Sequence, residues 1–221
     1  MTSQRRQKKK RYIHHTADPH LIEQQLTPER AAKLRHVAAN RQQGLLVVME
    51  NVFNPHNLGA VARTCDAFGV QQIAFTVGQG ASFDPSKAGW LASRSANKWL
   101  DYRMLMQGTE AALNTLKAEG WHLLAAVAET TAPSLYEVDF TQFPQLALLV
   151  GNEGRGLSTA ALALADSTVH IPMVGMVASL NVSVATAILL AEITRQRRAS
   201  STRFTISDAE ADALYQDFLK R

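Results

Sequence analysis

Cysteine is nearly absent from this chain of 221 residues, which contains only Cys65. One cysteine cannot form a disulfide within the chain or provide a cysteine-rich zinc site, so both kinds of stabilised domain are excluded. Cys65 lies in an apolar stretch, where we expect it to fill the core. The length fits one domain with extensions, which can bury a hydrophobic core without cross-links.

Long apolar runs are also missing. The longest uncharged apolar segment, residues 182–191, is far shorter than the roughly 20 residues that cross a bilayer. Residues 12–23 lack the apolar run of a secretory signal peptide. We therefore expect a soluble cytoplasmic protein that makes no contact with a membrane.

Acidic residues are missing from the start of the chain, where the first is Asp18. Without the basic residues of this segment, the chain has 17 Lys and Arg against 19 Asp and Glu, so the net charge of +4 belongs to the N-terminus. Such a block is typical of a solvated arm that binds a polyanion such as nucleic acid, although it could simply aid solubility. The six basic residues are Arg5, Arg6, Lys8, Lys9, Lys10 and Arg11.

The remaining chain alternates between short apolar runs, typical of buried strands, and segments with helical periodicity. Strands are predicted at residues 45–49, 72–77, 99–104, 121–128, 146–150 and 168–172. Helices are predicted between them at residues 58–68, 108–119, 159–164 and 182–198. The alternation predicts an α/β fold, with a mainly parallel sheet and helices on both faces. The last of these helices has few charges, so we expect it to pack on both sides.

Four parts of the chain are distinguished by composition. Residues 1–26 form the basic arm, and residues 27–43 an accessory helix with Thr27 as N-cap and Pro28 in its first turn. Residues 44–198 form the main α/β domain, and residues 199–221 a linker followed by a separate helix. Within the main domain, residues 78–98 are rich in Gly, Ser and Ala and predict a long functional or mobile loop.

Three segments follow predicted strands, and ligands of open α/β sheets bind beyond the carboxyl ends of the strands. The first is residues 54–64, in which Asn57 is predicted to cap the following helix. Arg63 is the only Arg, Lys, Asp or Glu between Glu50 and Asp66. Its guanidinium could bind a phosphate or carboxylate of a ligand, and an ion pair with Asp66 would explain it equally well.

The second segment is the glycine-rich stretch of residues 151–157. Its spacing is not the G-x-G-x-x-G of dinucleotide-binding proteins, and it lacks the Lys-Ser or Lys-Thr pair of a P-loop. Its glycines predict either a structural turn or a backbone that a ligand approaches closely. Glu153 favours a ligand site, because a carboxylate at a strand end can accept from a hydroxyl or an amine.

The third segment, residues 171–185, begins with a loop of Met, Val and Gly. Such a loop predicts an apolar pocket that wraps an adenine and a thioether through main-chain contacts. Ser179 and Asn181 add polar groups where the next helix begins. An ordinary core helix with an N-cap would explain the sequence from Val182 onward, but it would not explain the composition of the loop before it.

Together these segments resemble the three motifs of the SpoU or TrmH branch of the SPOUT RNA methyltransferases, in the family's order. The resemblance covers roughly residues 45–198. Within the branch, the chain is most similar to the TrmH enzymes that methylate a guanosine ribose in tRNA. The rRNA guanosine methyltransferases, however, share nearly the same third motif. The residues that carry it read N-P-H-N-L-G-A-V-A-R-T, G-N-E-G-R-G-L and I-P-M-V-G-M-V-A-S-L-N-V-S-V-A-T.

The resemblance implies 2′-O-methylation of a ribose in structured RNA, with S-adenosylmethionine as cofactor and no metal. It also implies the SPOUT fold with a deep C-terminal trefoil knot, and a homodimer with its pocket beside the interface. Cofactor contacts fall to Gly151, Ile171 and Leu180, with Ala128 as a weaker candidate. The catalytic arginine falls on Arg63, supported by Asn57, Glu153, Ser179 and Asn181.

Two other functions stay open. A non-catalytic RNA-binding or assembly protein could use the same fold, although Arg63, Glu153 and Asn181 argue for an enzyme. A nicotinamide-dependent α/β enzyme is disfavoured by the spacing of the glycines.

Overall fold

The structure is a computed structural model that describes residue 23, residues 25–76 and residues 96–221. The prediction of a basic arm, apart from its last residues, lies outside the described part, as does most of the predicted loop at residues 78–98. No helix in the described ranges is long and apolar enough to cross a membrane.

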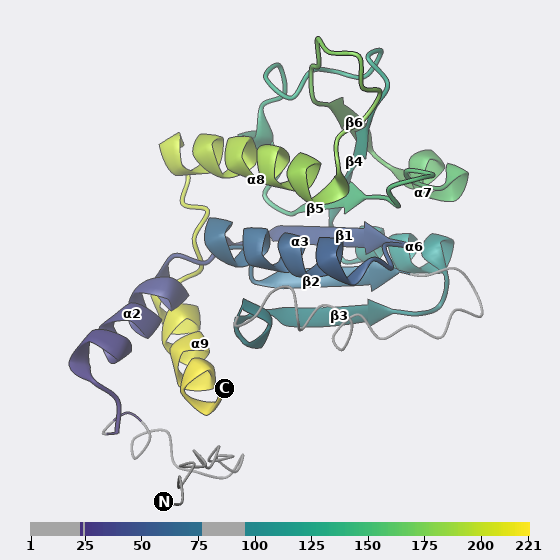
Figure 1. Cartoon of the computed structure of the whole chain (residues 1–221). Helices are drawn as coiled ribbons and strands as arrows, with labels where there is room; N and C mark the ends of the chain where they lie inside the picture. Colours follow the sequence, from purple (N-terminus) through teal and green to yellow (C-terminus); the bar gives the residue numbers. More distant parts are fainter. Residues whose placement is uncertain (1–22, 24, 77–95) are drawn as a thin grey trace, which may run out of the picture.

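The centre of the molecule is one sheet in which every pair of neighbouring strands is parallel, in the order β3-β2-β1-β5-β4-β6. The predicted parallel sheet is therefore confirmed (Figure 1). The central strands β1 and β5 are buried along their whole length, which explains their continuous apolar sequences. The strands are β1 (Leu45–Glu50), β2 (Gln72–Thr76), β3 (Asp101–Leu105), β4 (His122–Val127), β5 (Leu146–Val150) and β6 (Ser167–His170).

The helices lie where the sequence predicts them, with ends that differ by a few residues. One end is a correction: α3 begins at Pro55, and Asn54 rather than Asn57 is its N-cap, accepting from the backbone of His56 at 2.9 Å. Besides two short 3-10 turns, η1 (Ala96–Trp99) and η2 (Phe140–Gln142), the helices are α2 (Pro28–Ala39), α3 (Pro55–Phe68), α6 (Thr109–Ala118), α7 (Thr159–Leu164), α8 (Val182–Ala199) and α9 (Asp208–Lys220).

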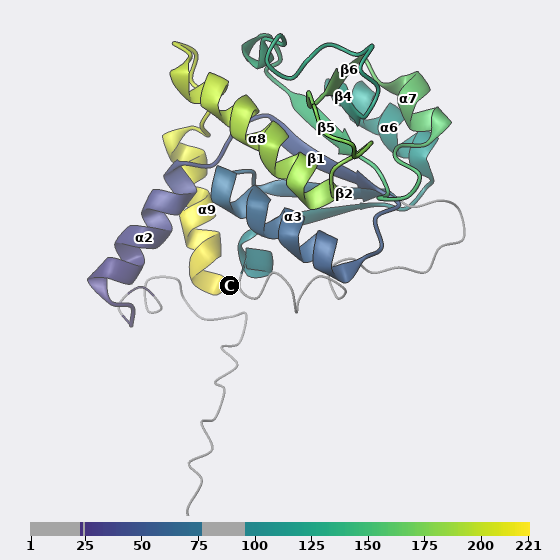
Figure 2. The same ribbon diagram turned by 45° about the horizontal axis from the view of Figure 1, so that its top comes forward.

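Helices cover both faces of the sheet, as predicted, and the alternation of side chains along β1 separates the two cores (Figures 1 and 2). Val47 and Met49 point to the face covered by α3 and α8, while Leu46 and Val48 point to the face covered by α6 and α7. Cys65 of α3 is fully buried in the first core, as expected, and burial raises the pKa of its thiol.

Helix α8 differs from its prediction, because one side only is fully packed within the single chain. Leu189, Leu190 and Ile193 are buried against the sheet and α3. On the other side Val184 is about half exposed. Helix α8 was expected to pack on both sides, so this exposed apolar residue leaves part of the helix surface available for another molecule.

The accessory helix α2 and the C-terminal helix α9 pack against each other, so α9 is not a separate element. Tyr215 and Phe218 of α9 are buried against Leu34 and Ala38 of α2. Ser207 and Glu210 form a capping box that fixes where α9 begins. The division of the chain into four parts remains a prediction.

Candidate active site

One cavity opens at the carboxyl ends of β4, β5 and β6, where a parallel α/β sheet is expected to bind its ligand. Its volume is about 320 Å³, within the usual range for small-molecule sites. The wall combines backbone and polar groups of three loops with apolar side chains from the ends of the strands and from α8. The main apolar contributors are Val127, Val150, Leu157, Val169, Val182 and Leu189.

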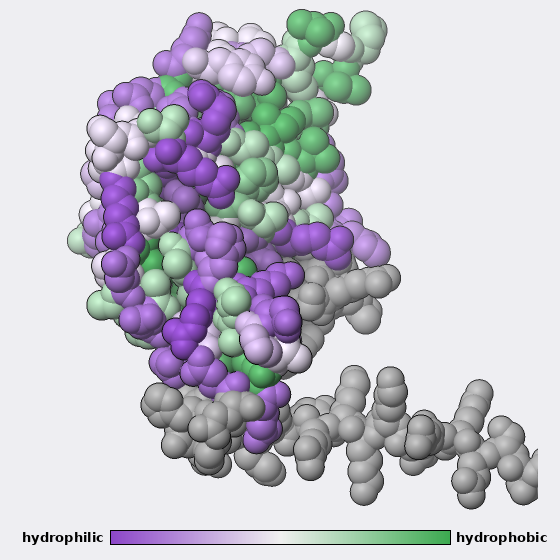
Figure 3. All heavy atoms as spheres, turned by 90° about the vertical axis from the view of Figure 1, so that its left-hand side faces the viewer, coloured by the Kyte–Doolittle hydropathy of each residue, from purple (hydrophilic) through white to green (hydrophobic). Residues whose placement is uncertain are grey.

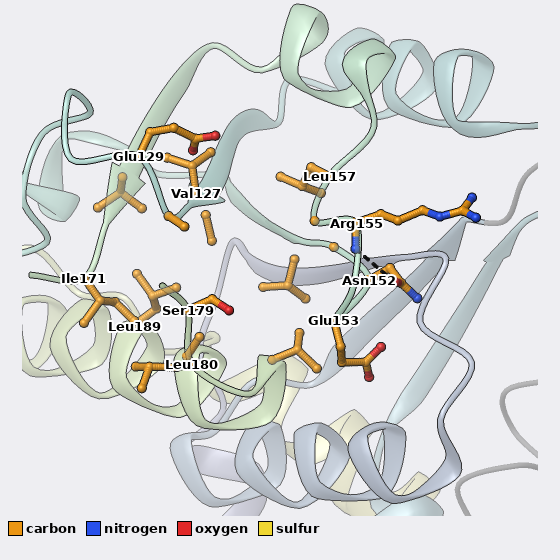
Figure 4. Close-up of a pocket in the computed structure, with 18 of the residues that line it drawn as sticks. Val127, Glu129, Asn152, Glu153, Arg155, Leu157, Ile171, Ser179, Leu180 and Leu189 are labelled. Carbon is orange, nitrogen blue, oxygen red and sulfur yellow. Dashed lines mark hydrogen bonds between the residues drawn. The ribbon is translucent and has the colours of Figure 1, made fainter. Parts of the chain in front are cut away.

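All four residues predicted to touch a cofactor line this cavity: Gly151, Ile171, Leu180 and Ala128. Ile171 and Leu180 are half-buried, and Figure 4 shows them on the same side of the cavity as Leu189. The structure thus brings these residues together from parts of the chain that are far apart in sequence, and their contact with a cofactor remains a prediction.

Gly151 lies where the chain passes against its own loop. A Cβ at this position would be 2.2 Å from the carbonyl carbon of Gly156 and 2.4 Å from the backbone nitrogen of Leu157. The close approach is held by two backbone hydrogen bonds between Asn152 and Gly156, of 3.0 and 2.8 Å. Glycine at 151 is therefore required by the backbone itself, which places the loop directly on the cavity wall.

One polar residue from each of the three segments takes part in one hydrogen-bonded chain. Asn181 Nδ2 donates to Asn57 Oδ1 at 3.0 Å, and Asn57 Nδ2 donates to Glu153 Oε1. Asn57 is 8% exposed, so its amide is committed to these two partners. Figure 4 shows the Glu153 side chain extending from the glycine loop towards α3. Of this chain, only Glu153 itself lines the cavity.

The beginning of α8 completes the arrangement. Asn181 caps α8, and its Oδ1 accepts from the backbone and hydroxyl of Ser183 at 2.8 and 2.6 Å. Ser179, two residues earlier, is exposed and lines the cavity. The Asn181 side chain thus uses its oxygen to cap the helix and its nitrogen to bind Asn57.

Arg63 lies apart from the cavity wall. It is exposed on α3, about one and a half turns beyond Asn57, and is not among the residues that line the cavity. Asp66, the candidate for an ion pair with Arg63, accepts from the buried Arg41 at 2.7 Å. Eight of the nine predicted site residues line the cavity or are connected to it through Glu153, and only Arg63 lies outside it.

Sequence reasoning missed two residues that hold the loops in place. Glu50 at the end of β1 is 2% exposed and accepts from Thr109 and from the backbone and hydroxyl of Ser158, all within 2.8 Å. Asn152 donates to the backbone oxygen of Asn51 at 3.0 Å and accepts from Gly154 at 2.9 Å. The sequence signal that could have identified Glu50 is its position as a carboxylate at the end of an otherwise apolar strand.

A third residue that the sequence did not single out, Glu129, follows β4 and lies on the cavity rim. With Glu153 it puts two carboxylates around the cavity, against one guanidinium from Arg155. In the described ranges no group of three or more His, Cys, Asp or Glu side chains is placed to hold a metal ion. The cavity therefore combines an apolar wall with an acidic rim.

Comparison with known proteins agrees with the motifs. The profile of the SpoU rRNA Methylase family matches residues 44–191. A tRNA (guanosine(18)-2'-O)-methyltransferase of Escherichia coli K12 is 38% identical over 175 residues, which are 78% of this chain and 72% of that protein.

Solved structures give the same result. The crystal structure of the A. aeolicus TrmH/SpoU tRNA modifying enzyme matches with a TM-score of 0.73 and 32% identity, covering 90% of this chain and 96% of that one. The SpoU methyltransferase AviRb from Streptomyces viridochromogenes, solved with AdoMet, matches with a TM-score of 0.60 and 30% identity, covering 72% and 61%. The chain therefore belongs to the SpoU methylase family, as its three motifs predict.

Proposed function

We propose that this protein transfers a methyl group from S-adenosylmethionine to the 2′-hydroxyl of a ribose in a structured RNA. The observation that carries the proposal is the convergence of three distant segments on one cavity. The loops after β4, β5 and β6 line it, and the hydrogen-bonded chain from Asn181 through Asn57 to Glu153 connects the loops after β5 and β6 to α3. The family membership supports the same chemistry.

A guanosine of tRNA is the substrate we favour. The relative from Escherichia coli is named for that activity, and the structure with the highest TM-score of those described above is named as a tRNA modifying enzyme and matches over nearly the whole of both chains. The family profile is named for rRNA methylation, which makes 23S rRNA the second candidate. Acting on tRNA, the protein would work in the cytoplasm.

The cavity suits the proposed methyl donor in shape and charge. Apolar side chains such as Ile171 and Leu189 can enclose an adenine and a thioether, and the backbone at Gly151 forms part of the cavity wall. The carboxylates of Glu129 and Glu153 favour a ligand that carries positive charge. Bound S-adenosylmethionine supplies an electrophilic methyl group on its sulfonium, so the protein has to position the acceptor and remove its proton.

Positioning is the task we assign to the loops. Holding two reacting atoms in line contributes on the order of 7 to 11 kcal/mol in well-oriented cases. Asn57 and Asn181 bind each other across two elements and hold Glu153 from one side, so the cavity wall is fixed before RNA arrives. Gly151, Ile171, Leu180 and Ala128 are the proposed cofactor contacts, and Ser179 faces the same space.

Arg63 is the proposed catalytic arginine. A guanidinium holds its proton too tightly to act as a good base. It serves better as a positive clamp on the phosphate next to the target ribose and on the oxygen as that oxygen loses its proton. Its exposed position on α3 suits a group that meets the RNA rather than the methyl donor.

We also propose a homodimer and the deep trefoil knot of the family. Support for the dimer comes from apolar side chains beside the cavity: Val174 and Met176 are fully exposed, and Val177 and Val184 are about half exposed or more. Figure 3 shows apolar side chains gathered towards the top of the molecule, where Figure 1 places the loop before α8. Support for the knot comes from the second and third motifs, which make it in this family.

The function is tested by methyl transfer from radiolabelled S-adenosylmethionine to unmodified tRNA and to 23S rRNA fragments. The wild type should label tRNA, while Arg63→Ala should lower turnover by two or more orders of magnitude and leave donor binding in calorimetry unchanged. Methyl transfer by Arg63→Ala at the wild-type rate would show that Arg63 is not a catalytic residue. RNA binding without any transfer would favour the non-catalytic alternative.

A further inference from the structure

Trp99 lies at the junction of η1, α2 and α9, on the opposite edge of the sheet from the cavity. Its ring meets Phe218 of α9 edge-on, with 5.3 Å between centroids and an angle of 73°. Its backbone oxygen accepts from Gln71 at 3.1 Å. Ring and backbone are therefore held by separate contacts, which makes Trp99 a fixed platform beside α9.

Two cations approach this one ring from different elements. The guanidinium carbon of Arg30 in α2 is 5.2 Å from the ring centroid, and Lys98 Nζ is 4.4 Å from it. Partial burial and the neighbouring charge of Arg30 both lower the pKa of Lys98. Each cation gains from the ring, yet the two repel each other.

The carboxylates around this junction are engaged by other residues. Asp101 and Asp217 both pair with Arg221, and Glu23 pairs with Arg35. Neither Arg30 nor Lys98 forms an ion pair with any residue in the described ranges. The result is two positive charges at one ring, neither of them in an ion pair with those residues, a pattern that an external anion would relieve.

We propose that Arg30, Lys98 and Trp99 form a clamp for a phosphodiester of the RNA substrate. The inference rests on the proposed function for the nature of the ligand. Two cations held at one aromatic ring suit a negatively charged backbone phosphate, and the ring can contact the adjoining sugar or base. The highly basic residues 5–11 precede α2 in the sequence, so the same part of the chain adds further positive charge.

The clamp lies at the amino end of β3, whereas the cavity lies at the carboxyl ends of the parallel strands. A strand of five residues spans roughly 17 Å, so the two sites are at least that far apart. An RNA must therefore extend well beyond the methylated nucleotide to reach both. A full tRNA is large enough, while a short stem-loop would lose the contact with the clamp.

The test compares RNA affinity across a series of salt concentrations for the wild type and for the double variant Arg30→Gln, Lys98→Gln. Glutamine keeps a polar side chain at each position and removes both charges. Arg195→Gln is the matched control, because Arg195 is an exposed cation that pairs only with Glu192 on its own helix. Thermal melting of each variant checks that it is folded.

The double variant should bind unmodified full-length tRNA about ten-fold more weakly in 0.1 M salt, with the slope of log K against log salt lowered by about 1 to 2. KM for tRNA should rise, while affinity for S-adenosylmethionine stays constant. The control should match the wild type. For an isolated stem-loop, wild type and double variant should bind equally.

A folded double variant with the affinity and salt slope of the wild type would overturn the clamp. That result is distinguishable from failure of the proposed function. A wild type that transfers methyl groups to tRNA while the double variant binds normally refutes the clamp alone. A wild type that binds tRNA through the clamp but transfers nothing refutes the enzymatic function alone.

Discussion

At the scale of single residues, Gly151 is the most constrained position of the cavity. The atoms that a Cβ would meet belong to the backbone of Gly156 and Leu157, so no side chain can move aside to make room. Gly154 in the same loop meets only the side chain of Asn152, at an ordinary distance of 3.5 Å. The two glycines therefore have different functions in one loop.

We expect Gly151→Ala to weaken binding of S-adenosylmethionine by ten-fold or more, because the loop must shift by a large part of an ångström to accept a methyl group. Gly154→Ala is the matched control and should bind the donor within about two-fold of the wild type. Titration calorimetry of both variants measures the difference. Equal affinities would show that the loop backbone at 151 does not form part of the donor site.

Asn57 supplies a second test, because its amide must donate at one end and accept at the other. Asn57→Asp loses the donor to Glu153 and places two carboxylates together, which should lower the free energy of unfolding by about 2 kcal/mol and reduce methyl transfer. Glu153→Gln keeps an acceptor oxygen and should retain most of the stability. Urea unfolding measures both; a stable, active Asn57→Asp variant would refute the hydrogen-bonded chain.

The two roles considered for Asn57 show what a sequence can indicate about a residue. Its place in the first motif marked it as a site residue, but its assignment as helix cap was wrong. Pro55 was the signal for the correct cap, since proline favours the first turn of a helix and so points to Asn54. Its actual partners, Glu153 and Asn181, are 96 and 124 positions away, and no local pattern indicates such contacts.

At the scale of elements, apolar runs were enough to locate the inner strands β1, β2, β4 and β5, whereas the edge strands β3 and β6 carry more polar residues and were placed with ends that differ by up to two residues. Strands buried on both faces read as continuous apolar segments, which is why β5 was placed at its true ends. The order of the strands was not predictable in the same way, because it depends on which edges pair after folding. The packing of α9 on α2 was missed for a similar reason: amphipathic helices show that they pack, without showing against what.

His122 joins three elements near the start of β4 and gives the stability of this region a pH dependence. Its ring stacks on Phe143 at 4.0 Å, and its Nε2 is 2.7 Å from the hydroxyl of Ser167. Partial burial lowers the pKa of His122 below its ordinary value of 6.5, an effect to which Lys117 adds. The folded state therefore takes up this proton less readily than the unfolded chain.

Stability linked to His122 is thus fully present above pH 6.5 and is lost as the pH falls through the lower pKa of the folded state. The melting temperature of the wild type should fall between pH 7 and pH 5 by more than that of His122→Gln. Calorimetry at several pH values measures the difference between the two proteins. Parallel curves would mean that His122 does not contribute to the pH dependence.

At the scale of the whole molecule, the exposed apolar loop before α8 is the basis for expecting a dimer. Light scattering coupled to gel filtration should give the wild type about twice the chain mass of 24.2 kDa. Met176→Lys should shift it towards the monomer, because a charge would be buried in the interface. Met104→Lys, on the edge strand β3, is the control and should remain dimeric. A monomeric wild type would contradict the proposal.

The central claim is that the cavity at the carboxyl ends of the strands serves methyl transfer to a ribose oxygen of RNA. The most direct measurement is mass spectrometry of nucleosides from unmodified tRNA after incubation with the protein and S-adenosylmethionine. The account predicts a single new 2′-O-methylguanosine, and about ten-fold less of it with the Gly151→Ala variant at limiting donor. Methylation on a base, or no methylated nucleoside in tRNA or rRNA, would contradict it.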